Sequence, residues 1–251
     1  AGTEAAWQAA KAGVNVHLYE MRPQRQTPAH TTDRLAELVC SNSLGSYLIN
    51  KAPGLLKAEM RGLGSMVLDC AEQAAVPAGS SLAVDRDVFA ELVTEKIELT
   101  PKIHLHRQEV TSIPDAPTII ASGPLTSSSL ADQIQALSGQ EHLYFYDAIS
   151  PIVFADSIDQ KMAFRASRYE EGEGDYLNLP LDGPGYRRFV DALLEAQTVP
   201  LHGFESTRYF EGCLPIEEIA RRMDLTSEQV LAHVEVIRRL DPKPGVKFSD
   251  R

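Results

Sequence analysis

Two of the three cysteines lie in sequence contexts that could support nucleophilic chemistry. Cys40 is followed by Ser-Asn-Ser, whose polar groups are unusual in a packed core, and Cys213 lies between a glycine and a Leu-Pro pair. A thiolate stabilised by nearby amides or cations is a strong nucleophile, whereas most cysteines are small buried apolar residues. Both interpretations stay open for Cys40 and Cys213. Cys70 ends a helical pattern, and we predict that its role is structural.

A second group of residues has the spacing of a dinucleotide-binding unit. Gly2 opens a helical stretch, Val16 and Leu18 alternate as in a strand, and Glu20 follows. In the complete unit a strand runs into a G-x-G-x-x-G turn, the amides of the next helix bind a pyrophosphate, and an acid after the second strand binds the ribose hydroxyls. Gly2 would be the third glycine and Glu20 the ribose acid. We therefore expect the first strand and two glycines of the unit to be missing.

The segment Ala121-Ser122-Gly123 supports this interpretation. It ends an apolar stretch that predicts a buried strand from Thr118, and a side chain at Gly123 would collide with a cofactor packed beside the strand. Gly2, Glu20 and Gly123 are thus the predicted cofactor-binding residues of a flavin-type domain. The alternative is an α/β layer that holds no nucleotide.

Strands and helices alternate along the first half of the chain, which predicts an α/β fold. Residues 54–73 have helical spacing, with Leu55, Leu56, Met60 and Leu63 on one face. A strand leads into a helix from about Asp85. The remaining predicted elements are a strand within 102–113, a helix capped by one of Ser127 to Ser129, and a helix over 183–196.

Composition narrows the function classes. The chain has 251 residues, 43% of them hydrophobic, and a net charge of −11, which argues mildly against a nucleic-acid binder. Local basic groups form either a phosphate-binding patch or a solvated face. The cysteine spacing predicts neither a disulfide framework nor a metal site, and we expect a cytoplasmic protein without a membrane segment. One such group is Lys51, Lys57 and Arg61, and the other is Arg165 and Arg168.

Several long segments carry a resemblance to a known family. They include "HLYEMRPQRQTPAH", "ELVCSNSL", "VPAGSSLAVDRDVF", "YFYDAISPIVFADSID" and "YFEGCLPIE". From residue 1 to about 218 the chain closely resembles the folate- and FAD-dependent tRNA (uracil-5-)-methyltransferase family, TrmFO. The resemblance implies methylation of uridine C5 in the T loop of tRNA, with a one-carbon unit from 5,10-methylenetetrahydrofolate and reducing equivalents from FAD and NAD(P)H.

The resemblance also assigns roles to the cysteines. A thiolate that adds to C6 of uracil makes C5 nucleophilic enough to attack an electrophilic one-carbon unit. By motif, Cys213 would be this nucleophile, and Cys40 would assist proton removal at C5 or protect the site. The base must leave the T-loop stack, so a pocket for a flipped base is implied, and the basic groups would hold the tRNA backbone.

The last part of the chain has a different pattern. Thr226 to Gln229 form a capping box, Val230, Val234 and Ile237 line one helical face, and Asp241-Pro242 ends the helix. Residues from about 216 to 251 resemble the core-binding region of the enhancer-dependent, nitrogen-type sigma factor, which implies contact with RNA polymerase. An ordinary helical hairpin is the alternative.

We therefore expect a composite chain, either a faulty assembly or a natural fusion, with impaired methylation. Its predicted architecture is an incomplete Rossmann-like FAD-binding domain with an inserted α+β substrate domain and a C-terminal helix-turn-helix-like hairpin. The predicted domains are a partial FAD-binding domain (1–125), an inserted substrate and tRNA domain (126–213), and a helical hairpin of different origin (214–251).

Overall fold

The computed structural model describes residues 1–27, 29–39, 41–139, 154–167, 174–197 and 219–221, together with the backbone at 238–239. These residues belong to two compact units. Of the described residues, the first unit contains 1–75 and 81–139, and the second contains 76–80 and those from 154 onward. The predicted domain boundary after residue 125 therefore falls inside the first unit.

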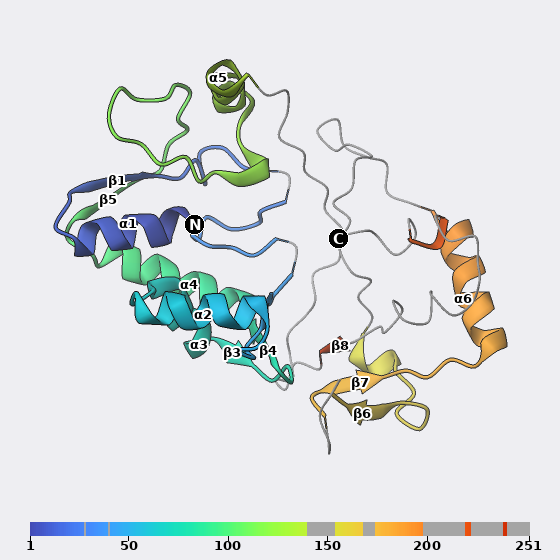
Figure 1. Ribbon diagram of the computed structural model, residues 1–251. Helices are drawn as coiled ribbons and strands as arrows, with labels where there is room; N and C mark the ends of the chain where they lie inside the picture. The colour runs from blue at the N-terminus through green and yellow to red at the C-terminus, as the bar shows by residue number, and fades with distance from the viewer. Residues whose placement is uncertain are drawn as a thin grey trace. The chain divides into compact units, whose positions relative to one another are not determined.

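Figure 1 shows the helices and strands along the chain. The elements up to residue 139 are α1 (Gly2–Lys11), β1 (Val16–Tyr19), β2 (Ser43–Ser46), α2 (Ala52–Gly62), α3 (Met66–Gln73), β3 (Ala75–Val76), β4 (Ser81–Val84), α4 (Arg86–Glu98), β5 (Ile103–His106), the 3-10 helix η1 (Gly123–Leu125) and α5 (Ser128–Ser138). The later elements are η2 (Ala155–Ser157), β6 (Phe164–Ala166), β7 (Tyr176–Asn178), α6 (Gly183–Glu195) and β8 (Arg238–Arg239).

A parallel pair of strands positions the candidate site. β1 and β5 pair with Val16 opposite Ile103 and Tyr19 opposite His106. Parallel strands need a long crossover between them, and here the crossover contains helices α2, α3 and α4. A second sheet has the order β2-β4-β3, with β2 antiparallel to β4. The parallel pair with its helical crossover confirms the predicted α/β fold class.

The core of the first unit lies between these strands and three helices. Helices α1, α3 and α4 pack together, α1 covers β1 and β5, and α4 packs against β5 (Figure 1). Helix α4 buries Phe89, Val93 and Ile97, whose spacing of four residues places them on one face. The Asp85 side chain caps this helix by accepting hydrogen bonds from the N–H groups of Asp87 (3.0 Å) and Val88 (3.1 Å). The helix predicted to begin at about Asp85 is thus confirmed.

In the second unit, β6 pairs antiparallel with β7, and β7 pairs antiparallel with β8. Helix α6 is capped by Asp182, whose Oδ1 accepts a hydrogen bond from the Gly185 N–H at 2.6 Å, and it buries Tyr186 and Val190 against Ala220. The helix predicted over 183–196 is confirmed.

Residues 118–122 do not form the predicted strand. Ile119 and Ile120 are 73% and 41% exposed. An apolar stretch becomes a strand only when a neighbouring strand supplies backbone partners. Among the strands that the structure describes, none pairs with this segment.

The apolar face predicted for α2 is largely exposed. Leu55, Leu56 and Leu63 are 48%, 56% and 73% exposed, whereas Met60 is half-buried against the core. The buried residues of this helix are Gly54 and Lys57.

The packing of Gly54 explains this orientation. A Cβ atom at Gly54 would lie 2.0 Å from the Leu48 carbonyl oxygen, so the backbone of α2 packs directly on the backbone of the preceding loop. Lys57 lies three residues further along the same face. A close approach between two backbones therefore fixes which face of α2 is buried.

The predicted C-terminal hairpin lies mostly outside the described residues. Residues 219–221 are helical, as predicted. Arg238 and Arg239, however, pair with Leu177 and Tyr176 as a short strand, where the sequence pattern predicts helix up to Asp241. The edge of β7 offers backbone partners that a local sequence pattern does not reveal.

Candidate cofactor-binding site

The first turn of α1 lies beside two other segments of the predicted site. A Cβ atom at Gly2 would lie 3.6 Å from the Ala121 Cβ and 4.0 Å from the Leu18 Cδ1. These are ordinary contact distances, so the described packing would admit a side chain at Gly2. The structure thus brings together the start of α1, the end of β1 and the Ala121-Ser122-Gly123 segment, which are far apart in the sequence.

The start of α1 offers backbone donors. The first intrahelical bond runs from the Ala5 N–H to the Ala1 carbonyl at 3.0 Å, so the amides before Ala5 have no partner within the helix. The Glu4 carboxylate points toward the start of α3, where its Oε2 accepts hydrogen bonds from Ser65 Oγ and the Val67 N–H, both at 2.9 Å. An anion at this helix end would meet donor groups and the positive end of the helix dipole.

Gly123 begins the 3-10 helix η1 with φ of +67°. No atom of the described residues lies within 4 Å of the position that a Cβ atom would take. The left-handed backbone, rather than crowding by protein atoms, therefore favours glycine here. Thr126 Oγ1 donates to the Gly123 carbonyl at 2.6 Å and closes the turn.

Glu20 follows directly after β1, and its N–H extends the parallel pairing by donating to the His106 carbonyl at 3.0 Å. Its carboxylate receives three hydrogen bonds from Arg22. The Arg22 N–H and Nε donate to Oε1, and Nη2 donates to Oε2, each at 3.0 Å. Burial of Glu20 acts to raise the pKa of this carboxyl, but the bonds and charge of Arg22 outweigh it and hold the pKa below its usual value. Glu20 is therefore ionised at neutral pH.

Arg22 and Glu37 are parts of this site that sequence reasoning missed. Arg22 Nη1 donates to the Glu37 carboxylate at 2.8 Å and to the Thr32 carbonyl at 3.1 Å. The spacing Glu-Met-Arg after a predicted strand could have drawn attention to Arg22, because the two side chains start only two residues apart. Nothing in the local sequence indicated Glu37, which lies 15 residues further on.

The two predicted functional cysteines, Cys40 and Cys213, lie outside the described residues. The segment after Cys40 is described, and Asn42 anchors it to β4. The Asn42 Nδ2 donates to the Val84 carbonyl at 3.0 Å, and the Val84 N–H donates to the Asn42 carbonyl at 3.0 Å. Cys70 is fully buried and unpaired, and burial raises the pKa of its thiol. Its predicted structural role is confirmed.

Lys57 does not contribute to a basic patch with Lys51 and Arg61. Lys57 is 7% exposed, and its Nζ donates to the carbonyls of Leu44 (2.5 Å), Ser46 (3.2 Å) and Pro53 (3.2 Å). An ammonium group that is buried and bound to these carbonyls cannot bind the phosphates of a tRNA backbone. Arg61 forms an ion pair with Glu72.

The remaining basic residues named in the prediction are described only in part. Lys51 and Arg165 are exposed, and Arg168 lies outside the described residues.

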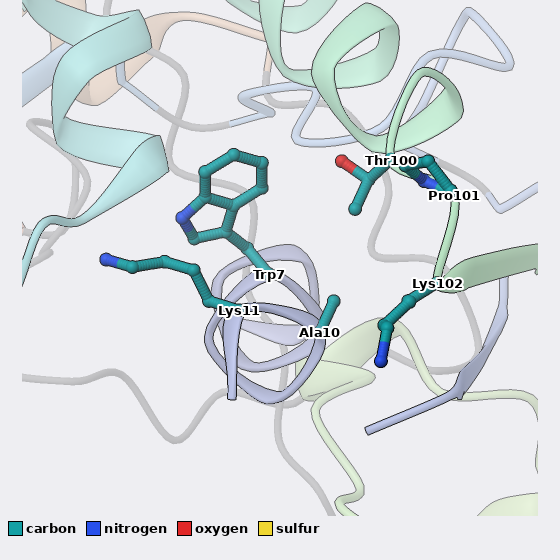
Figure 2. Close-up of a pocket in the computed structure, with 6 residues that line it drawn as sticks. All are labelled: Trp7, Ala10, Lys11, Thr100, Pro101 and Lys102. Carbon is teal, nitrogen blue, oxygen red and sulfur yellow. The ribbon is translucent and has the colours of Figure 1, made fainter. Parts of the chain in front are cut away.

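A groove of about 300 Å³ lies elsewhere, between the second half of α1 and the turn that joins α4 to β5. Figure 2 shows Trp7, Ala10 and Lys11 on one side and Thr100, Pro101 and Lys102 on the other. None of these residues was predicted to bind the cofactor. Ala10 lies eight positions along α1 from Gly2, which at 1.5 Å per residue is about 12 Å.

Two absences concern only the residues that the structure describes. No helix among them is long and apolar enough to cross a membrane. No group of three or more His, Cys, Asp or Glu side chains within the described ranges is arranged to hold a metal ion.

These features define the class of protein. It is an α/β protein in which a glycine-led helix, the end of a parallel strand and a small-residue turn meet beside an ionised carboxylate. The chain belongs to the glucose inhibited division protein A family, whose model matches residues 1–238.

Curated relatives agree with this assignment. The chain is 58% identical over 247 residues to a protein of Koribacter versatilis (strain Ellin345). This alignment covers 98% of the chain and 55% of that relative. A relative from Anoxybacillus flavithermus is 56% identical over 222 residues, 88% of the chain and 51% of the relative. Both are named "Methylenetetrahydrofolate--tRNA-(uracil-5-)-methyltransferase TrmFO". The chain spans about half the length of these relatives. The resemblance to TrmFO proteins is confirmed.

The comparisons do not support a separate origin for the C-terminal residues. The family match continues to residue 238. A TrmFO relative from Brevibacillus brevis aligns over 247 residues at 51% identity, which is 98% of the chain and 56% of that relative. The sigma-factor resemblance and the contact with RNA polymerase that it implied therefore have no support.

Proposed function

We propose that this chain is part of an enzyme that methylates C5 of a uridine in the T loop of tRNA. The one-carbon unit comes from 5,10-methylenetetrahydrofolate, and the reducing equivalents come from FAD and NAD(P)H. The observation that carries this proposal is the 58% identity, over 98% of the chain, to a protein named for this reaction. The cytoplasmic location expected from the sequence stays a prediction.

The residues near the start of α1 fit FAD. Donor amides at the helix end suit a pyrophosphate, and an ionised Glu20 suits a ribose hydroxyl. The neighbouring 121–123 segment has small side chains that leave room for a ring system. We propose that Gly2, Glu20 and Gly123 contribute to this site within a Rossmann-like FAD-binding domain, with a substrate domain inserted in it. When bound, FAD would supply the reducing equivalents that convert a methylene group to a methyl group.

The proposed chemistry of the protein depends on two thiols. The thiolate of Cys213 adds to C6 of the uracil, which forms a carbon–sulfur bond and moves the electron pair toward C5 and the O4 carbonyl. The C5 electron pair then forms a bond to the electrophilic one-carbon unit, and the bond between that unit and its carrier would break as the reducing equivalents convert it to a methyl group. Cys40 assists removal of the C5 proton or protects the site, and departure of the Cys213 thiolate restores the C5–C6 double bond. The base must be flipped out of the T loop to reach these groups.

Trapping with RNA that contains 5-fluorouracil tests this proposal. Fluorine at C5 cannot be removed as a proton, so the carbon–sulfur adduct accumulates. We expect the chain to form a covalent adduct with a T-loop RNA of this kind, and Cys213→Ala to abolish it. Cys70→Ala is the matched control, because that thiol is fully buried. An adduct that persists in Cys213→Ala would overturn the role of Cys213.

Co-purification of flavin is the second test. An absorption band of bound flavin in the purified chain, weakened by Glu20→Gln, would support the cofactor site. Glu109→Gln is the control, because Glu109 pairs with Arg25 rather than with Arg22. Equal flavin content in all three proteins would refute the role of Glu20.

A further inference from the structure

We propose that Arg22 is a positioning residue for the dinucleotide, which fixes the Glu20 carboxylate so that one acceptor site stays open for a ribose hydroxyl. This inference rests on the proposed function of Glu20. It concerns a side chain that the sequence analysis did not single out.

The hydrogen bonds of Glu20 define the open site. A carboxylate has two oxygens with about four acceptor positions. Oε1 accepts two hydrogen bonds from Arg22, from its N–H and its Nε, and Oε2 accepts one, from Nη2. Within the described part of the chain, one acceptor position therefore remains, on Oε2. A ribose hydroxyl needs one acceptor.

The other side of the Arg22 guanidinium is held by the segment that leads toward Cys40. Nη1 donates to the Glu37 carboxylate and the Thr32 carbonyl. Glu37 is itself fixed, because it accepts hydrogen bonds from the N–H and hydroxyl groups of both Thr31 and Thr32, at 2.8 to 3.1 Å. Arg22 thus has anchors on two sides and little freedom to rotate.

Burial makes this arrangement specific for arginine. The Arg22 side chain is 4% exposed, and the side chains of Glu20 and Glu37 are 21% and 13% exposed. A planar guanidinium donates in a fixed fork that matches a carboxylate, whereas a lysine ammonium is a point charge. Lysine at this position would keep the charge but could not make the same set of hydrogen bonds.

Arg25 provides a matched control. It lies three residues from Arg22 in the same loop and also pairs with a carboxylate, that of Glu109 at 2.5 Å. Its side chain is 44% exposed, and it makes no described contact with Glu20. Loss of Arg25 removes one positive charge from the loop and leaves the support of Glu20 intact.

The first experiment measures FAD affinity by flavin fluorescence in the unaltered chain, Arg22→Met, Arg22→Lys and Arg25→Met. We expect the affinity for FAD to fall by about 10- to 100-fold in both Arg22 variants, which is the usual effect of losing a hydrogen bond to a charged group. In Arg25→Met we expect the affinity to change by no more than about twofold. Full affinity in Arg22→Lys would overturn the proposal, because charge alone would then suffice. Equal losses in Arg22→Met and Arg25→Met would also overturn it.

The second experiment needs no cofactor. The carboxyl carbon of Glu20 is titrated by NMR in the unaltered chain, Arg22→Met and Arg22→Lys, with Trp7 fluorescence as the check on folding. The groups that act on the pKa of Glu20 are Arg22 and, more weakly, the charge of His30. Without Arg22 the burial of Glu20 is no longer offset, so its pKa should rise in Arg22→Met.

These two readouts separate the possible failures. An unaltered chain that binds no FAD would refute the proposed cofactor site, and the positioning of a ribose would fall with it. An unaltered chain that binds FAD, combined with an unchanged Glu20 titration in Arg22→Met, would refute the positioning role alone. Arg22→Lys supplies both readouts if Arg22→Met does not fold.

Discussion

Replacement of Gly54 by alanine tests the most crowded glycine among those described in the first unit. The new Cβ would lie 2.0 Å from the Leu48 carbonyl oxygen and 2.4 Å from the Leu48 carbonyl carbon. Ordinary contact is about 3.5 Å, so α2 and the loop must separate by about 1.5 Å. Such overpacking costs about 1–3 kcal/mol, and the helix propensity of alanine returns about 0.5–1 kcal/mol. We expect the free energy of unfolding to fall by about 1–2 kcal/mol.

Urea unfolding followed by Trp7 fluorescence measures this change. Trp7 is the only tryptophan of the chain and packs against the core of the first unit, so it reports on the unit that contains Gly54. Gly62→Ala is the matched control. Gly62 ends the same helix, and no atom of the described residues lies within 4 Å of its Cβ position. We expect Gly62→Ala to be neutral or to stabilise the unit by up to about 1 kcal/mol. Equal stability of the two variants would refute the steric reasoning.

Three other changes have expected outcomes. Asp85→Ala removes the cap of α4 and should lower the free energy of unfolding in urea by about 1 kcal/mol, whereas Asp85→Asn should keep most of the capping stabilisation. An alanine variant as stable as the unaltered chain would contradict the capping role. Lys57→Met removes the ammonium that donates to the carbonyls of Leu44, Ser46 and Pro53 and should cost about 1–3 kcal/mol in the free energy of unfolding. The exposed Lys51→Met should cost less than about 0.5 kcal/mol, and similar losses in the two variants would count against the buried contacts. The pKa values of Glu20 and Glu37 are lowered in the fold, because hydrogen bonds outweigh the opposing effect of burial. The contribution of the two carboxylates to the free energy of unfolding is therefore complete above their unfolded pKa and is lost as the pH falls below about 5. Glu37→Gln should flatten the acid limb of the pH–stability curve, and an unchanged acid limb would show that Glu37 does not contribute.

Several features of the fold were determined locally and could be predicted from the sequence. Helix α4 begins where Asp85 can cap it, and α6 begins after Asp182 in the same way. The strand at Ile103–His106 follows from its alternating pattern. Capping bonds and side-chain alternation act over a few residues, so a sequence alone contains the information that determines them.

The candidate cofactor site was only partly predictable. The positions of Gly2 and Glu20 relative to a helix and a strand follow from their spacing, and the structure places Ala121 beside Gly2. The partner of Glu20 was not predicted, because Arg22 owes its orientation to Glu37 and Thr32, which a loop brings back to the end of β1. Motif spacing draws attention to Glu20 but not to the groups that lower its pKa and fix its orientation.

Only the tertiary structure decided which face of α2 is buried. The apolar residues Leu55 and Leu56 predicted one face, but Gly54 and Lys57 are buried instead. The close approach of the Leu48 backbone requires the glycine, and three carbonyls that the fold leaves on that side satisfy the Lys57 ammonium. A buried ammonium is stable only where such acceptors converge. Their convergence depends on how the loop and the helix pack, which periodicity along a single helix does not contain.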